Sequence, residues 1–185
     1  FPGLKVVSPA TPYDAKGLLK SAIRTDDPVL FIEHATLYQT RGEVPEDEEY
    51  TVPIGVSDIK REGSDVTIVG YAQGLQVALE AAEKLASEGI EAEVVDLRTL
   101  RPLDMDPVLE SFKKTFKAVI VEEGYGMYGI SSEIAAQIQE QGFDYLDAPI
   151  KRVSQLQAPL PYSRELEQSA LINPGRVVEA VKEII

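Results

Sequence analysis

The sequence of 185 residues contains no cysteine, no tryptophan and a single histidine, His34. The lack of cysteine excludes disulfides, thiolate catalysis, iron–sulfur clusters and cysteine-based zinc sites. With one histidine, a histidine-based metal site is not expected, and any Ser–His–Asp triad would have to use His34. His34 follows an apolar run that is typical of a strand end, so a structural role is favoured over a catalytic one.

Long apolar runs and an excess of basic residues are also missing. No run approaches the roughly 20 apolar residues that span a bilayer, and no signal-peptide pattern opens the sequence. The 18 basic and 31 acidic residues give a net charge of −13, which argues against nucleic acid and an anionic membrane surface as partners. Five carboxylates fall within residues 43–49, and we interpret this segment as a solvated loop.

The first forty residues predict a βαβ unit with parallel strands. An apolar run at residues 4–8 predicts a strand, and a second strand is expected at residues 29–33. Between them, Thr11 can cap a helix, Pro12 suits its first position, and apolar residues recur at helical spacing up to Ile23. The start at Phe1-Pro2-Gly3, without an initiator methionine, suggests a point inside a longer protein.

From residue 38 to residue 53 the apolar periodicity fails, which indicates a linker between two domains. After it, strands alternate with helices. Strands are expected at 66–71, 92–97, 118–121 and 150–153, and helices at 75–86, 106–112, 130–138 and 173–184. This alternation predicts a three-layer α/β/α domain with a mostly parallel sheet.

The loop from Gly124 to Gly129 matches the dinucleotide-binding pattern G-x-G-x-x-G between a strand and a helix. A free-standing nucleotide-binding α/β domain is therefore an alternative reading. Three features weaken it: Glu122 and Glu123 would repel a pyrophosphate, no acidic residue ends the next strand, and the loop comes late in the alternation. The other interpretation is a tight glycine turn before a helix that Ser131 caps.

Three further segments carry weaker signals. Gly70 and Gly74 bracket a strand-to-helix turn whose amides could hold an anion, although most such turns only connect elements. Residues 96–104 carry charges of both signs at a strand's carboxyl end, where an internal ion-pair network is at least as good an interpretation as substrate contact. Asp26-Asp27-Pro28 is either a plain helix stop or part of a cation site built on unpaired helix carbonyls.

Several segments occur together in the order and spacing of one family. They are residues 2–9, 14–23, 27–29, 94–104 (Val94-Val95-Asp96-Leu97-Arg98-Thr99-Leu100 with Pro102-Leu103-Asp104), 122–124 and 147–150. On these motifs the whole chain resembles the beta subunit of the thiamine-dependent decarboxylating component of 2-oxoacid dehydrogenase complexes, with pyruvate dehydrogenase as the nearest member. A transketolase-like or other thiamine-dependent enzyme is the alternative within the same fold.

The resemblance implies a domain organisation and a cofactor. Residues 1–40 would be the C-terminal remnant of a pyrimidine-binding α/β domain, 41–55 a linker, and 56–185 a transketolase-type C-terminal domain. The whole enzyme would decarboxylate a 2-oxo acid on thiamine diphosphate with magnesium and transfer the acyl group to a lipoyl domain. The family's catalytic residues would lie upstream of Phe1, so the chain is expected to hold no catalytic or cofactor-binding residue and to be inactive alone.

The resemblance also implies sites and partners. Potassium would bind the backbone oxygens of Ala22, Ile23, Thr25 and Asp27. The partners would be an alpha subunit, a second beta subunit, and the subunit-binding domain of the acyltransferase, which would dock on Asp147 and the terminal carboxylate of Ile185. The expected location is the cytoplasm in a bacterium, and the mitochondrial matrix or plastid stroma in a eukaryote.

Overall fold

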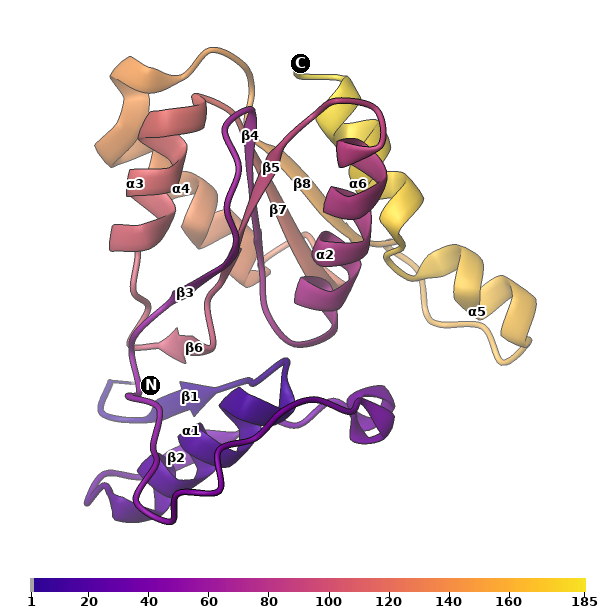
Figure 1. Cartoon of the computed structure of the whole chain (residues 1–185). Helices are drawn as coiled ribbons and strands as arrows, with labels where there is room; N and C mark the ends of the chain where they lie inside the picture. Colours follow the sequence, from indigo (N-terminus) through magenta and orange to yellow (C-terminus); the bar gives the residue numbers. More distant parts are fainter. Residues whose placement is uncertain (1) are drawn as a thin grey trace.

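The computed structural model describes residues 2–185 and contains two sheets (Figure 1). The larger sheet has the strand order β3-β5-β4-β7-β8. Strand β3 is antiparallel to β5, whereas the other four strands are mutually parallel. The strands are β3 (Asp58–Arg61), β4 (Val66–Gly70), β5 (Ala92–Asp96), β7 (Ala118–Tyr125) and β8 (Lys151–Gln155).

Helices cover both faces of this sheet, as Figure 1 shows. On one face lie α2 (Ala72–Ala86) and α6 (Pro174–Lys182), and on the other α3 (Asp106–Thr115) and α4 (Ile130–Gly142). Strands β4 and β5 are buried along their whole length, and the buried residues include Thr67, Glu93 and Asp96 beside the apolar ones. The predicted three-layer α/β/α fold is confirmed. No helix within residues 2–185 has the length and apolarity that crossing a membrane requires.

The smaller sheet contains the N-terminal βαβ unit. Strand β1 (Lys5–Val7) pairs in parallel with β2 (Val29–Phe31), and α1 (Pro12–Arg24) connects them. The predicted helix start is confirmed, because the Thr11 hydroxyl accepts a hydrogen bond from the Asp14 backbone N–H at 3.1 Å. The other edge of β1 pairs antiparallel with β6 (Thr99–Arg101), which comes from the C-terminal part of the chain.

Short elements were not predicted. These are β3, β6, the helix α5 (Arg164–Ala170), and the 3-10 helices η1 (Ala35–Gln39) and η2 (Phe143–Tyr145). Strands β3 and β6 are short and carry charged residues, so neither shows the apolar run of a buried strand. Helix α5 projects from the rest of the domain (Figure 1) and buries only Ala170.

Residues 41–55, which we call the strap, contain no regular helix or strand and run along α1. Two lysines of α1 hold the strap by its backbone: the ammonium of Lys16 donates to Pro45 O at 2.5 Å, and that of Lys20 donates to Glu48 O. The acidic loop is exposed as expected. It nevertheless follows a defined path, because its carbonyl oxygens accept these bonds.

Candidate functional site

A crevice lies where the chain reverses its direction across the large sheet. From β4 the chain crosses to β5 through α2, and it then returns past β4 to β7 through α3. Ligands of α/β proteins bind outside the carboxyl ends of the strands at such a switch point. Here the N-terminal unit covers this position and leaves a cavity of about 370 Å³, whose lining includes Ser8, His34, Tyr71, Ala72, Leu100 and Glu123.

An ion pair crosses this crevice. His34 Nε2 lies 2.6 Å from Glu123 Oε2, and His34 Nδ1 lies 2.7 Å from Thr36 Oγ1. Both ring nitrogens are therefore engaged. The pair joins the N-terminal unit to the end of β7, which agrees with a structural role for His34.

Tyr71, at the carboxyl end of β4, contributes a hydroxyl that stays protonated. Burial, followed by the nearby carboxylates of Glu122 and Glu123, raises the pKa of Tyr71 to about 12. The next residue, Ala72, has a positive φ of 45°, a conformation that is strained for a residue with a Cβ. The crevice thus offers a hydroxyl donor and carboxylate acceptors beside the imidazole of His34, which is paired with Glu123.

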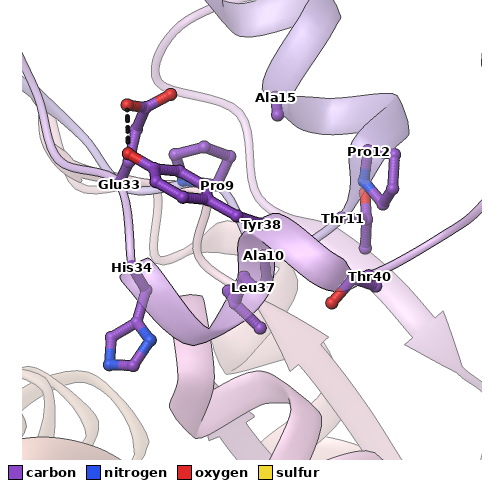
Figure 2. A pocket seen from close by; sticks show the side chains of 10 residues that line it. All are labelled: Pro9, Ala10, Thr11, Pro12, Ala15, Glu33, His34, Leu37, Tyr38 and Thr40. Atoms are coloured by element: carbon purple, nitrogen blue, oxygen red, sulfur yellow. Dashed lines mark hydrogen bonds between the residues drawn. The ribbon is translucent and has the colours of Figure 1, made fainter.

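A second, smaller cavity of about 210 Å³ lies between α1 and η1 (Figure 2). Apolar side chains such as Pro9, Ala10 and Leu37 form much of its wall. Two polar side chains of the lining bind each other, because the Tyr38 hydroxyl donates a hydrogen bond to Glu33 Oε2 at 3.0 Å. That hydrogen bond, and then the charge of Glu33, raises the pKa of Tyr38. The cavity suits an apolar group and shows no catalytic arrangement.

In the glycine loop from Gly124 to Gly129, a carboxylate occupies the place that a pyrophosphate would need. Buried Glu122 accepts hydrogen bonds from the Ser131 backbone N–H at 3.2 Å and from the Ser131 hydroxyl at 2.5 Å, at the start of α4. A Cβ on Gly129 would collide with this carboxylate. The capping prediction for Ser131 is wrong: Gly129 is the N-cap, and Ser131 binds Glu122 instead. The geometry disfavours the nucleotide-binding alternative.

The glycines at the start of α2 have a packing role. A Cβ on Gly74 would lie 2.8 Å from Val121 O of β7, and one on Gly70 would lie 3.0 Å from the backbone of Gly74. Small residues are therefore required for β4, α2 and β7 to approach one another. This close packing accounts for the two glycines without an anion.

The four residues predicted to bind potassium lie at the carboxyl end of α1. Ala22 and Ile23 belong to its last turn, Thr25 is its C-cap, and Asp27 follows in the turn before β2. The ammonium of Lys5 lies 2.8 Å from Thr25 Oγ1 and 2.9 Å from Asp27 Oδ2. Between residues 2 and 185, no group outside α1 donates a hydrogen bond to the four backbone oxygens. They have the character that a hard cation requires.

The two residues predicted to dock a partner are Asp147 and Ile185, and the C-terminus at Ile185 lies at the end of the domain away from the N-terminal unit (Figure 1). Asp147 is exposed and precedes β8, and its backbone N–H donates to Phe116 O at 3.2 Å. Ile185 is 56% exposed and follows α6, which packs against β8. Both residues are accessible, and both adjoin the amino end of β8.

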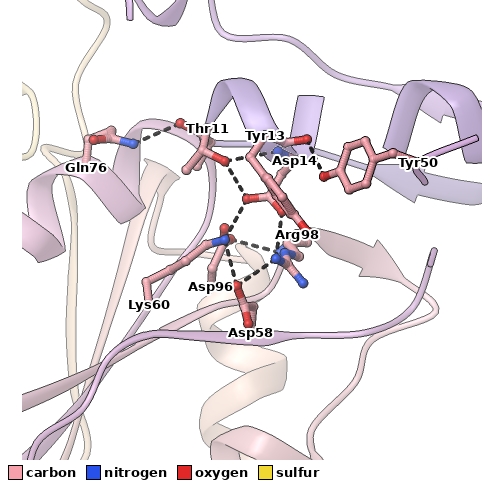
Figure 3. Close-up of polar contacts among 10 residues, drawn as sticks. Thr11, Tyr13, Asp14, Tyr50, Asp58, Lys60, Gln76, Asp96 and Arg98 are labelled. Atoms are coloured by element: carbon pink, nitrogen blue, oxygen red, sulfur yellow. Dashed lines mark hydrogen bonds and ion pairs between the residues drawn. The ribbon is translucent and has the colours of Figure 1, made fainter. Parts of the chain in front are cut away.

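Charged residues form a network where α1 meets the large sheet (Figure 3). Lys60 Nζ lies 2.7 Å from Asp14 Oδ2 and 2.7 Å from Asp58 Oδ2. Arg98 Nη2 lies 2.7 Å from Asp14 Oδ1 and 2.6 Å from Asp58 Oδ2, and the Arg98 backbone N–H donates to Asp96 Oδ1 at 3.0 Å. The internal network proposed for residues 96–104 is present. Its partners Asp14, Asp58 and Lys60 were missed, because they are distant in sequence.

Both parts of the chain are similar to known protein families. The family description "Transketolase, C-terminal domain" matches residues 55–177, and "Transketolase, pyrimidine binding domain" matches residues 1–41. The pyruvate dehydrogenase E1 component subunit beta, mitochondrial, of Dictyostelium discoideum is 48% identical over 99% of this chain and 52% of that protein. The 2-oxoisovalerate dehydrogenase subunit beta of Bacillus subtilis is 49% identical over 99% of this chain and 56% of that protein.

A solved structure described as a split gene transketolase, inactive beta4 tetramer, is similar over the whole chain. The TM-score is 0.78 at 30% sequence identity, covering 100% of this chain and 57% of that one. The chain spans about half the length of the curated relatives it matches. These relatives include beta subunits of dehydrogenases that act on different substrates.

Proposed function

The chain belongs to the transketolase C-terminal domain family, and from this membership we propose that it is the C-terminal part of the beta subunit of a 2-oxoacid dehydrogenase, with pyruvate as the 2-oxo acid. The observation that carries the proposal is the 48% identity to a pyruvate dehydrogenase beta subunit over 99% of the chain. The 2-oxoisovalerate relative is 49% identical, so identity alone does not separate the two substrates. We choose pyruvate because the motifs described in the sequence analysis resemble those of pyruvate dehydrogenase.

The division of labour within the proposed enzyme follows from the geometry. Thiamine diphosphate with magnesium would supply the electron sink for decarboxylation, and we assign no residue of this chain to it. The crevice at the switch point is crossed by the pair of His34 and Glu123, and the start of α4 is filled by Glu122. The role proposed for His34 and Glu123 is to fix the C-terminal domain against the pyrimidine-binding part, whereas Glu122 fixes the start of α4 within the C-terminal domain. We retain the division into 1–40, 41–55 and 56–185.

We also propose that potassium binds the backbone oxygens of Ala22, Ile23, Thr25 and Asp27. These carbonyls lie at the negative end of the dipole of α1, where a cation is stabilised. The Lys5 ammonium beside Thr25 and Asp27 shows that this turn already accepts positive charge. Potassium would hold the last turn of α1 in the conformation that leads into β2.

The proposed partners are the alpha subunit, a second beta subunit, and the acyltransferase's subunit-binding domain. The last would dock at Asp147 and the carboxylate of Ile185, and the chain ends away from the N-terminal unit (Figure 1). A net charge of −13 favours encounter with a basic partner and makes the association rate sensitive to salt. The proposed location is the cytoplasm of a bacterium, or the mitochondrial matrix or plastid stroma of a eukaryote.

A chimera tests the proposed function. The matching half of the Dictyostelium beta subunit would be replaced by residues 1–185 of this chain and expressed with its alpha subunit. We expect the chimera to assemble and to release carbon dioxide from pyruvate, whereas the isolated chain with thiamine diphosphate and magnesium should not. A chimera that folds but does not join the alpha subunit, or turnover by the isolated chain, would contradict the proposal. The same replacement in the Bacillus 2-oxoisovalerate subunit tests whether the chain also assembles within a beta subunit of another dehydrogenase.

A further inference from the structure

The network at the junction of α1 and the large sheet contains three carboxylates and two cations (Figure 3). Asp14 from α1 and Asp96 from the end of β5 are both fully buried. The side chain of Asp58, on β3, is 37% exposed and can be hydrated. The buried part of the network therefore contains two carboxylates, Asp14 and Asp96, and two cations, Lys60 and Arg98.

The two cations serve Asp14 and Asp58 rather than Asp96. Lys60 and Arg98 each contact both Asp14 and Asp58 at 2.6–2.7 Å. Asp96 receives one hydrogen bond, from the Arg98 backbone N–H, and its Oδ2 has no hydrogen-bond partner among the described residues. A buried carboxylate without a cation of its own is destabilised in its charged form and takes up a proton instead.

Within residues 2–185, Asp96 takes part in no ion pair, although the charges of Lys60 and Arg98 act on it from nearby. In the register of β5, Asp96 lies opposite Asp58 of β3 on one side and Gly70 of β4 on the other. From the strap, the Tyr50 hydroxyl approaches α1 and donates to Tyr13 O at 2.9 Å. Burial raises the pKa of Asp96 to about 7, against the opposing effects of Lys60 and of the Arg98 backbone hydrogen bond.

We propose that protonation of Asp96 stabilises the contact between the N-terminal unit and the C-terminal domain. Asp96 is neutral when the two parts pack tightly, and its ionisation weakens this joint between α1 and the sheet. Ionisation releases the proton to solvent and places a third negative charge beside Asp14. The attraction that Lys60 and Arg98 exert on Asp14 is then shared with Asp96. Because Asp14 belongs to α1, the contact between α1 and the sheet weakens.

The sign of the pH dependence follows from the two protonation states. Asp96 has an ordinary value of 3.8 when exposed and is raised to about 7 in the folded chain, so the folded state binds the proton more tightly. Its contribution to stability is complete below pH 3.8 and declines as pH rises. It is lost above about pH 7.

The first test compares urea unfolding of the 185-residue chain and its Asp96→Asn variant from pH 5 to pH 8. Asparagine keeps the size of the protonated acid and cannot ionise. We expect the variant to be the more stable already at pH 5, and the gap between the urea midpoints to widen up to about pH 7. The control is Asp144→Asn, at an exposed position, which should follow the unchanged chain at every pH.

The outcome that overturns the proposal is a constant difference between Asp96→Asn and the unchanged chain across this range, since a purely structural role acts equally at every pH. A second measurement uses no variant: the side-chain carboxyl carbon of Asp96, followed by NMR, should titrate with a midpoint near 7. A midpoint below 5 overturns the proposal even if the variant fails to fold. Hydrogen exchange of the backbone amides of α1 locates the weakened contact. Above pH 7 the exchange should accelerate by more than base catalysis alone explains.

Discussion

Gly17 on α1 and Val52 on the strap lie so close together that a Cβ on Gly17 would be 2.5 Å from Val52 Cγ2 and 2.9 Å from Val52 N. The strap is therefore seated against the helix backbone itself. Ser21, one turn further along α1, donates its hydroxyl to Val52 O at 2.5 Å. The strap can therefore follow this path only because Gly17 has no side chain.

Gly17→Ala is expected to destabilise the chain by about 1–3 kcal/mol, because the added methyl group overpacks a buried contact. The sign of this change in the free energy of unfolding is informative, because replacing glycine by alanine within a helix otherwise stabilises a protein by up to about 1 kcal/mol. Urea unfolding measures the change. The control is Gly124→Ala, where a Cβ meets no atom within 4 Å; if both variants gained stability, the strap would not be seated as described.

Ser131→Ala is expected to lower the free energy of unfolding by about 1–3 kcal/mol, because buried Glu122 loses its hydroxyl donor. The remaining donor from this residue is the Ser131 backbone N–H. Thermal and urea unfolding measure the loss. Ser169→Ala removes an exposed hydroxyl that bonds only to Leu166 O, so it should change little. Equal effects of the two substitutions would mean that the Glu122 carboxylate does not depend on Ser131.

Replacing sodium with potassium at constant ionic strength should raise the thermal midpoint of the full-length protein. A cation that binds only the folded state at about 100 times its Kd stabilises by about 2.7 kcal/mol. Asp27→Asn is the matched variant: it keeps the backbone oxygen but removes the ion pair with Lys5. This variant should retain the increase in thermal midpoint with potassium. An unchanged full-length protein that is equally stable in sodium and in potassium would contradict the site.

Asp147→Ala, and separately one residue added after Ile185, should each weaken binding of the acyltransferase's subunit-binding domain. Losing a charge that is desolvated and paired in the complex costs about 2 kcal/mol or more, whereas losing a rim charge costs little. Calorimetry with the full-length beta subunit measures the affinity. Asp144→Ala, close by and exposed, is the control. Unchanged affinity in both test variants would reject the docking assignment and leave the fold and family unaffected.

The alternation of helices and strands could be predicted because the central strands are buried on both faces, and such strands are rich in apolar residues. The start of α1 could be predicted as well, because the signals of Thr11 and Pro12 are local. Strands β3 and β6 could not, because their residues are largely polar or charged and their pairing depends on partners elsewhere in the chain. No sequence pattern reports tertiary pairing of that kind.

The polar sites show the same limit. The charges of residues 96–104 indicated a network, but its partner Asp14 comes from α1, far away in sequence. Glu122 was noted only as a group that would repel a phosphate. Its position before a glycine turn and a helix was a usable signal, since a carboxylate is stabilised at a helix amino end. The docking and potassium residues came from the resemblance and remain predictions.

The pairing of β1 with β6 affects how the protein is made. During synthesis, residues 5–7 leave the ribosome long before residues 99–101, so the N-terminal sheet cannot acquire its third strand until β4, α2 and β5 have emerged. Until then, one edge of β1 stays unpaired, and an unpaired strand edge can associate with other chains. Once β6 has joined, a protease cut within the strap should leave the two pieces held together, so fragments would separate on a denaturing gel but migrate as one particle under native conditions.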